Sequence, residues 1–208
     1  MKPTTLAFAI GAVALVLVII GVAGFMSVRP DTDVPDQASA DPGRYENATY
    51  GYSFAYPEGH EARAYTPDYV AVGRTTGGSF DSSADVTIVR GDIIESMLAM
   101  CAADGPNESM SCTSIRRQDP VETSTGFSGV RYFLNEAVTD TSTGITSVRE
   151  KGPFFAFDIS PNVPESARGY LVIHAPIASG ASGTSQLDQN LISGIVDSLR
   201  VSRVENGL

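Results

Sequence analysis

The residues most able to perform chemistry in this chain include two histidines, which lie in different kinds of segment. His60 lies in an acidic turn, residues 57–61, and the H-E-x-x-H spacing of a helical zinc site is absent. His174 lies in an alternating apolar segment, residues 169–175, which predicts a strand with the histidine facing away from its aliphatic neighbours. A metal site at either histidine would need ligands from distant segments. We therefore expect a solvated turn at His60 and a structural histidine at His174.

The chain also has two cysteines, Cys101 and Cys112, which lie close together in the sequence. Their spacing is not C-x-x-C and neither histidine is nearby, so a disulfide is expected and a metal or redox pair is the alternative. Closing a loop of about 12 residues in this way would stabilise the fold by about 3 kcal/mol.

Motifs for nucleophilic catalysis are missing from the sequence. It contains no G-x-S-x-G, no Ser-x-x-Lys and no glycine-rich phosphate loop. Two carboxylates facing each other across a cleft could still act as acid and base, and the 24 acidic residues offer many pairs. Because no pair is singled out, we expect no catalytic residues, no cofactor, no metal site and a protein that is not an enzyme.

The first element that must position these residues is an unbroken apolar run from Leu6 to Met26. About 21 residues at 1.5 Å per residue give about 30 Å of helix, which is the thickness of a membrane's hydrocarbon core. A cleaved signal peptide is the alternative, but its A-x-A site, residues 38–40, is distant and is followed closely by a proline. We expect residues 1–28 to form an uncleaved signal-anchor with a single transmembrane helix.

Charge and cysteine usage indicate the compartment. The net charge is −10 and lysine occurs only at positions 2 and 151, so neither nucleic acid nor an anionic lipid surface is an expected partner. Lys2 and Arg29 flank the apolar run and nearly balance each other, so the orientation depends mainly on the cysteine pair. We expect a cytoplasmic N-terminus and an extracytoplasmic C-terminal domain at the cell membrane.

Behind the apolar run the composition changes twice. Residues 29–44 are rich in Pro and Asp, which is typical of a flexible linker. Residues 45–203 contain enough apolar and aromatic side chains for one compact domain, and residues 204–208 form a tail.

Period-2 patterns within this domain predict strands, and two amphipathic patterns predict helices. The expected fold class is α+β, with a central, largely antiparallel sheet flanked by helices. The expected strands are residues 50–56, 62–65, 69–74, 85–90, 121–124, 129–138, 145–150, 154–160 and 169–175, and the expected helices are residues 92–102 and 185–199.

Two motifs resemble those of the PsbP-like family. Residues 45–57 read Y-E-N-A-T-Y-G-Y-S-F-A-Y-P, similar to that family's opening strand, and residues 195–201 read I-V-D-S-L-R-V, similar to its last helix and exit strand. The resemblance runs from Tyr45 to Val201, although the Trp that often follows the Tyr-Pro pair is absent. It implies a central antiparallel sheet flanked by helices, without a shared catalytic apparatus.

The layout of anchor, linker and domain predicts a non-enzymatic, membrane-anchored module that binds another envelope component or assists its assembly. The alternative is a small-ligand-binding protein or weak hydrolase with a pocket between sheet and helix, near His60 or His174. A purely structural spacer is the third hypothesis.

Overall fold

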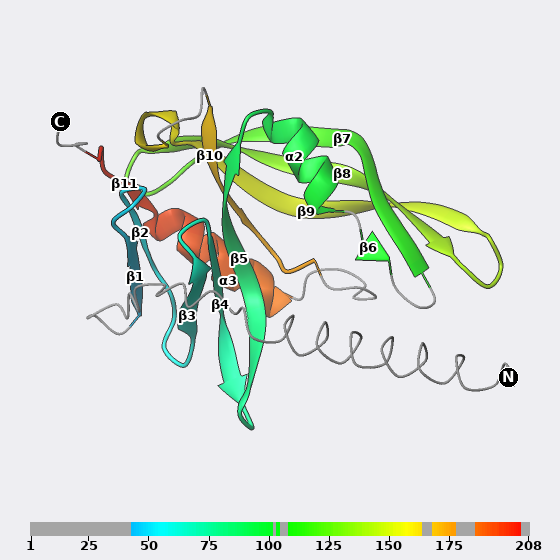
Figure 1. The fold of residues 1–208 in the computed structure, drawn as a ribbon, viewed down its shortest axis with the longest axis horizontal. Helices are drawn as coiled ribbons and strands as arrows, with labels where there is room; N and C mark the ends of the chain where they lie inside the picture. The colour runs from blue at the N-terminus through cyan, green and yellow to red at the C-terminus, as the bar shows by residue number, and fades with distance from the viewer. Residues whose placement is uncertain (1–42, 102, 105–107, 164–167, 178–185, 205–208) are drawn as a thin grey trace, which may run out of the picture. The chain divides into compact units, whose positions relative to one another are not determined.

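The computed structural model describes residues 43–101, 103–104, 108–163, 168–177 and 186–204, whose strands form two antiparallel sheets (Figure 1). The smaller sheet has the order β1 (Arg44–Asn47), β2 (Tyr52–Ala55) and β11 (Arg200–Val201). The larger sheet has eight strands. Their spatial order is β3 (Glu61–Thr66), β4 (Tyr69–Thr76), β5 (Ser79–Arg90), β10 (Gly169–His174), β9 (Thr146–Asp158), β8 (Ser128–Asp140), β7 (Glu108–Glu122) and β6 (Ala103–Asp104).

The predicted fold class is wrong. Most of the described residues lie in strands, and the described part contains only two short α-helices, α2 (Ile93–Met100) and α3 (Gln186–Ser198), with a single 3₁₀ turn, η1 (Ser160–Asn162). The described part of the chain is therefore mainly β, not a sheet flanked by helices, and the predicted N-terminal helix lies outside it. The lengths of the strands are underestimated from the sequence, because its proline and glycine residues predict the ends of strands.

Strand β9 shows how this error arose. The sequence predicted two strands, residues 145–150 and 154–160, separated by Gly152 and Pro153. The structure joins them, because these two residues lie opposite Phe133 where the register between β8 and β9 shifts. A proline is tolerated in a sheet at such an irregularity, where its missing N–H is not required by the ladder.

Two hydrophobic clusters hold the fold together. The first includes Ile192 and Ile195 of α3 and combines residues of both sheets, among them Phe54 of β2 and Leu171 of β10. Burying these aliphatic and aromatic side chains is the main favourable contribution to folding. Helix α3 therefore connects the small sheet to the large one.

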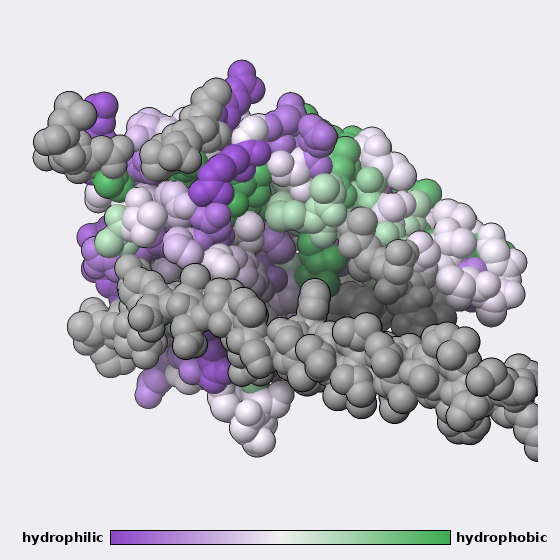
Figure 2. All heavy atoms as spheres, viewed as in Figure 1, coloured by the Kyte–Doolittle hydropathy of each residue, from purple (hydrophilic) through white to green (hydrophobic). Residues whose placement is uncertain are grey.

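The second cluster lies on the opposite face of the large sheet. Val172 of β10, Phe154 of β9 and Leu134 of β8 pack there with Met97 of α2. Asp92 caps α2, since its side chain accepts hydrogen bonds from the next turn, as a helix N-cap should. Figure 2 shows hydrophobic residues beside α2, next to hydrophilic residues on the same part of the surface.

No helix within the described ranges combines the length and the apolar composition needed to cross a membrane. The predicted signal-anchor from Leu6 to Met26 and nearly all of the predicted linker lie outside those ranges. The anchor and the orientation therefore stay predictions.

Candidate functional site

The structure separates the two histidines that the sequence singled out. His60 precedes β3 at one edge of the large sheet, and Arg74 Nε donates a hydrogen bond to its Nε2 at 3.1 Å. His174 ends β10 in the middle of that sheet. A shared site near both histidines is therefore not formed.

His174 is only 4% exposed and has a defined protonation. Its Nδ1 lies 2.7 Å from the carbonyl oxygen of Ala175, so this nitrogen donates and Nε2 is left without a proton. Burial lowers the pKa of His174; hydrogen bonding to Ala175 and the charge of Asp85 oppose this shift, and Lys151 adds to it. The ring packs against Phe154 at 5.3 Å between centroids. This environment suits a neutral histidine, and its structural role stays a prediction.

A buried carboxylate lies on the same face of the sheet. Glu136 of β8 is 1% exposed, accepts a hydrogen bond from Arg149 Nε and lies 3.7 Å from Lys151 Nζ. Arg149 is directly opposite Glu136 in the β8–β9 register, so strand pairing creates this cluster. Two cations surround one buried anion, which is the pairing that a buried charge requires. We assign this cluster a structural role.

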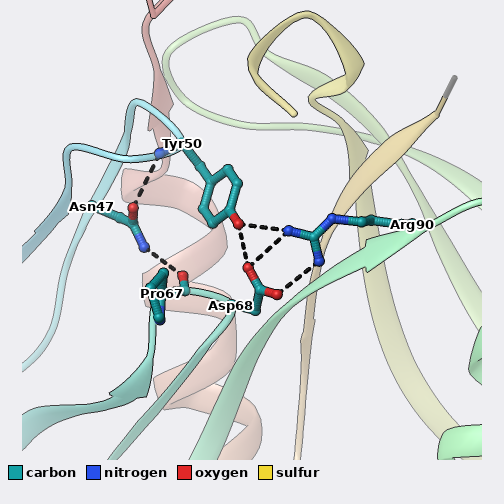
Figure 3. A network of polar contacts seen from close by, with 5 residues as sticks. All are labelled: Asn47, Tyr50, Pro67, Asp68 and Arg90. Atoms are coloured by element: carbon teal, nitrogen blue, oxygen red, sulfur yellow. Dashed lines mark hydrogen bonds and ion pairs between the residues drawn. The ribbon is translucent and has the colours of Figure 1, made fainter. Parts of the chain in front are cut away.

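A third polar network joins the β1–β2 turn to the large sheet (Figure 3). Arg90 donates to Asp68 from two nitrogens, at 2.7 and 3.1 Å, and to the hydroxyl of Tyr50 at 2.7 Å. The Tyr50 hydroxyl in turn donates to Asp68. The hydrogen bond from Arg90 holds the pKa of Asp68 below its ordinary value. Because these groups satisfy one another, we assign the network the structural role of joining the β1–β2 turn to the large sheet.

The two cysteines lie where the end of α2 meets β7. Cys101 follows α2 and Cys112 lies in β7, with Cα atoms 5.5 Å apart and sulfurs at disulfide distance. Both side chains belong to the second hydrophobic cluster. No group of three or more metal-ligating side chains occurs in the part of the chain that the structure describes.

The candidate site is a pocket between the small sheet and the C-terminal end of α3, which we call the anion pocket. It has a volume of about 230 Å³. Its lining residues are Arg44, Ser53, Phe54, Ala55, Ser124, Thr125, Ser198 and Arg200.

Strand register brings the charged residues of the anion pocket together. Arg200 of β11 is opposite Ser53 of β2, and Arg44 of β1 is opposite Ala55 of the same central strand. Since residues 53 and 55 lie on one face of β2, both arginines share that face. Arg44 Nη2 donates to Ser53 Oγ at 3.1 Å, which positions its guanidinium at the pocket.

The pocket is a local concentration of positive charge. None of its lining residues is acidic, and within the described ranges neither Arg44 nor Arg200 forms an ion pair. Register also places Glu46 opposite Ser53, but this residue does not line the pocket. Two guanidinium groups without an ion pair to a described residue, in a chain of net charge −10, supply the N–H donors that an anion site requires.

The opposite wall consists of hydroxyl groups that cover the end of α3. Ser124 donates to the carbonyl oxygen of Asp197, and Thr125 Oγ1 donates to that of Leu199 at 2.7 Å. Ser198 Oγ accepts a hydrogen bond from the backbone N–H of Ala55 at 2.9 Å. The carbonyls at a helix C-terminus carry partial negative charge, so these bonds reduce their repulsion of a bound anion.

The lining contains no histidine, carboxylate, cysteine or lysine. Its serines consequently have no general base beside them, and the arrangement suits binding more than covalent chemistry. A second pocket of about 300 Å³ includes both Asp158 and Arg203 and has no such excess of charge.

Sequence reasoning missed the anion pocket. Arg44 was assigned to the end of the linker and Arg200 to the exit from the last helix, more than 150 positions apart. No local motif joins them, because only the pairing of β1, β2 and β11 brings them to one face.

Comparisons with known proteins do not identify the chain. No protein-family model matches it, and a search of curated proteins finds no match. The PsbP-like resemblance accordingly depends on the two sequence motifs alone.

Proposed function

We propose that this protein is a membrane-anchored, extracytoplasmic binding module that holds a small anionic group of another envelope component in the anion pocket. The observation that carries this proposal is the pair Arg44 and Arg200. They line a pocket without acidic residues and have no ion-pair partner within the described ranges.

The position in the cell is supported by the sequence and by the cysteine pair. The apolar run from Leu6 to Met26 is long enough to span a bilayer, and it is followed by a Pro/Asp-rich linker. Cys101 and Cys112 lie at disulfide distance, which fits an oxidising compartment. The PsbP-like motifs support the same placement, since that resemblance implies anchored extracytoplasmic modules in bacteria.

Pocket size and chemistry limit the ligand. A volume of about 230 Å³ lies just below the range of about 300–1,000 Å³ that is typical for drug-sized ligands. Guanidinium groups recognise carboxylate and phosphate oxygens through paired N–H donors. The acidic protein surface repels anions at long range, so the short-range bonds from Arg44 and Arg200 must hold the ligand.

Binding of inorganic phosphate and sulfate to the full chain in a non-ionic detergent, measured by calorimetry, tests this function. Arg44→Gln and Arg200→Gln should each weaken binding about ten- to a hundredfold, because each removes a charge-assisted hydrogen bond worth about 1.5–3 kcal/mol.

Arg203→Gln is the matched control, since it removes the same charge from the second pocket. It should bind the anions as tightly as the unmodified chain. Absence of anion binding by the unmodified chain, or equal binding by the Arg44 and Arg200 variants, would reject the proposal.

A further inference from the structure

We infer that the anion pocket selects an acid that carries hydroxyl groups next to its charged group, such as a phosphorylated or carboxylated polyol. This inference rests on the anion binding proposed above and follows from the direction of the hydrogen bonds around the pocket. The guanidinium groups of one wall can only donate to a ligand, whereas the hydroxyl groups of the other wall can only accept.

The donating wall is formed by the small sheet. Arg44 donates one N–H to Ser53, and its other N–H groups can donate to a ligand. Arg200 forms no side-chain hydrogen bond with a described residue. Ser53 is 7% exposed, and its oxygen accepts the bond from Arg44, so its own O–H proton is available to a ligand. A buried hydroxyl lacking an acceptor is costly, so a ligand oxygen at this point is favourable.

The accepting wall is formed by the turn after β7. Ser124 has one hydroxyl proton, and it is donated to the carbonyl oxygen of Asp197. Thr125 likewise donates to Leu199 O, so in its 2.8 Å contact with Thr123 the Thr123 hydroxyl must be the donor. Ser124 and Thr125 therefore present only oxygen lone pairs to the pocket.

Ser198 extends the accepting wall. Its oxygen accepts from Ala55 N at 2.9 Å, and its proton is directed at backbone carbonyls, with Ile195 O at 3.1 Å. An unprotonated phosphate oxygen would place its own lone pairs against these oxygens and gain nothing from this wall. An alkyl group would leave the oxygens without a hydrogen bond, so a ligand hydroxyl is the group that fits.

Two phosphates of nearly equal size test this selection directly. Glycerol 1-phosphate and propyl phosphate share the charged group, but only the first has hydroxyls on the adjacent carbons. Calorimetry on the full chain in detergent should show glycerol 1-phosphate binding about tenfold more tightly, as two additional hydrogen bonds would give.

Single substitutions distinguish the contribution of the accepting wall from that of the donating wall. Ser124→Ala and Thr125→Val should reduce the ratio between the two affinities, whereas Ser53→Ala should weaken both ligands and leave that ratio unchanged. Circular dichroism checks that each variant is folded. The ligand pair on the unmodified chain decides the question even if a variant does not fold.

The outcomes distinguish the two proposals. Equal affinity for the two phosphates overturns the selectivity and leaves anion binding intact, while no binding of either phosphate overturns the anion function itself. The same chemistry occurs on free metabolites and on lipid headgroups. Displacement of glycerol 1-phosphate by short-chain phosphatidylglycerol would support selection of a headgroup, and failure to displace it would support a soluble ligand.

Discussion

At the scale of single residues, the arginines of this protein differ in what they contact. Six described arginines pair with carboxylates, and they are Arg63, Arg90, Arg116, Arg117, Arg131 and Arg149. Arg44 and Arg200 line one pocket together and form no ion pair within the described part of the chain. Exposed ion pairs contribute little to stability, so an unpaired arginine in a pocket is the more informative observation.

His174 should make the stability of the fold depend on pH. Its pKa in the folded state is below the ordinary value of 6.5, mainly because burial disfavours the charged ring. Below pH 6.5 the unfolded chain binds a proton that the folded chain does not, so stability is complete above this pH and falls as the pH is lowered towards the folded pKa. The slope for one proton is at most about 1.4 kcal/mol per pH unit.

Urea unfolding of the full chain in detergent at pH 7.0, 6.0 and 5.5 measures this slope. His174→Gln should reduce it because glutamine does not titrate, whereas the matched variant His60→Gln should retain it. An unchanged slope in the His174 variant would show that other groups produce the pH dependence.

At the scale of elements, α2 depends on a link to its neighbouring strand. The helix has only eight residues, from Ile93 to Met100, and a helix of this length is not stable alone. The Asp92 cap stabilises one end of α2, Met97 is buried in its middle, and the cysteine pair lies at its other end. A bond between Cys101 and Cys112 would fix the end of α2 to β7.

We expect that the two cysteines are bridged and that removing the bridge destabilises the domain by about 3 kcal/mol, the value for closing a loop of this length. The double variant Cys101→Ala/Cys112→Ala tests this by urea unfolding. Reductant should destabilise the unmodified chain and leave the double variant unchanged. Labelling of two free thiols in the native chain without reductant would refute the prediction.

At the scale of the whole domain, the two sheets are joined by polar contacts as well as by α3. Asn162 is 4% exposed, and its Nδ2 donates to Tyr50 O at 2.9 Å and to Ser202 O at 2.7 Å. Its Oδ1 accepts from Val204 N at 3.1 Å. The buried amide of Asn162 thus joins three segments: the loop between β9 and β10, the β1–β2 turn and the chain after β11.

Asn162→Ala should lower the free energy of unfolding by about 2–4 kcal/mol, since it breaks three hydrogen bonds and leaves buried backbone groups unpaired. The matched control is Asn135→Ala, which removes a single side-chain bond to Ser114 on the strand surface and should cost less than about 1 kcal/mol. Equal unfolding midpoints for the two variants would contradict this role of Asn162.

The contacts between the β1–β2 turn and the chain after β11 also explain why residue 51 is a glycine. Gly51 has φ +62°, and an added Cβ would lie 2.4 Å from Ser202 O. Only glycine adopts this conformation and permits this approach at little cost. The Y-G-Y sequence at this turn therefore reflects packing between β2 and the chain after β11.

Local chemistry alone determined several features of this protein. Alternation predicted the strands at 85–90 and 169–175, which lie within or overlap β5 and β10, and the capped pattern after Asp92 predicted α2. The proximity of the two cysteines also follows from their separation of 11 positions. These features depend on side-chain period, capping and short loops, all of which are encoded within a few residues.

Only the tertiary structure decided the mainly β architecture and the anion pocket. Pro120 and Pro153 lie inside long strands, because pairing with β8 outweighs their local tendency to end a strand. Arg44 and Arg200 lie near each other because β2 pairs with strands from opposite ends of the domain. Strand pairing joins residues that are distant in sequence, so neither period nor motif could place these two charges on one face.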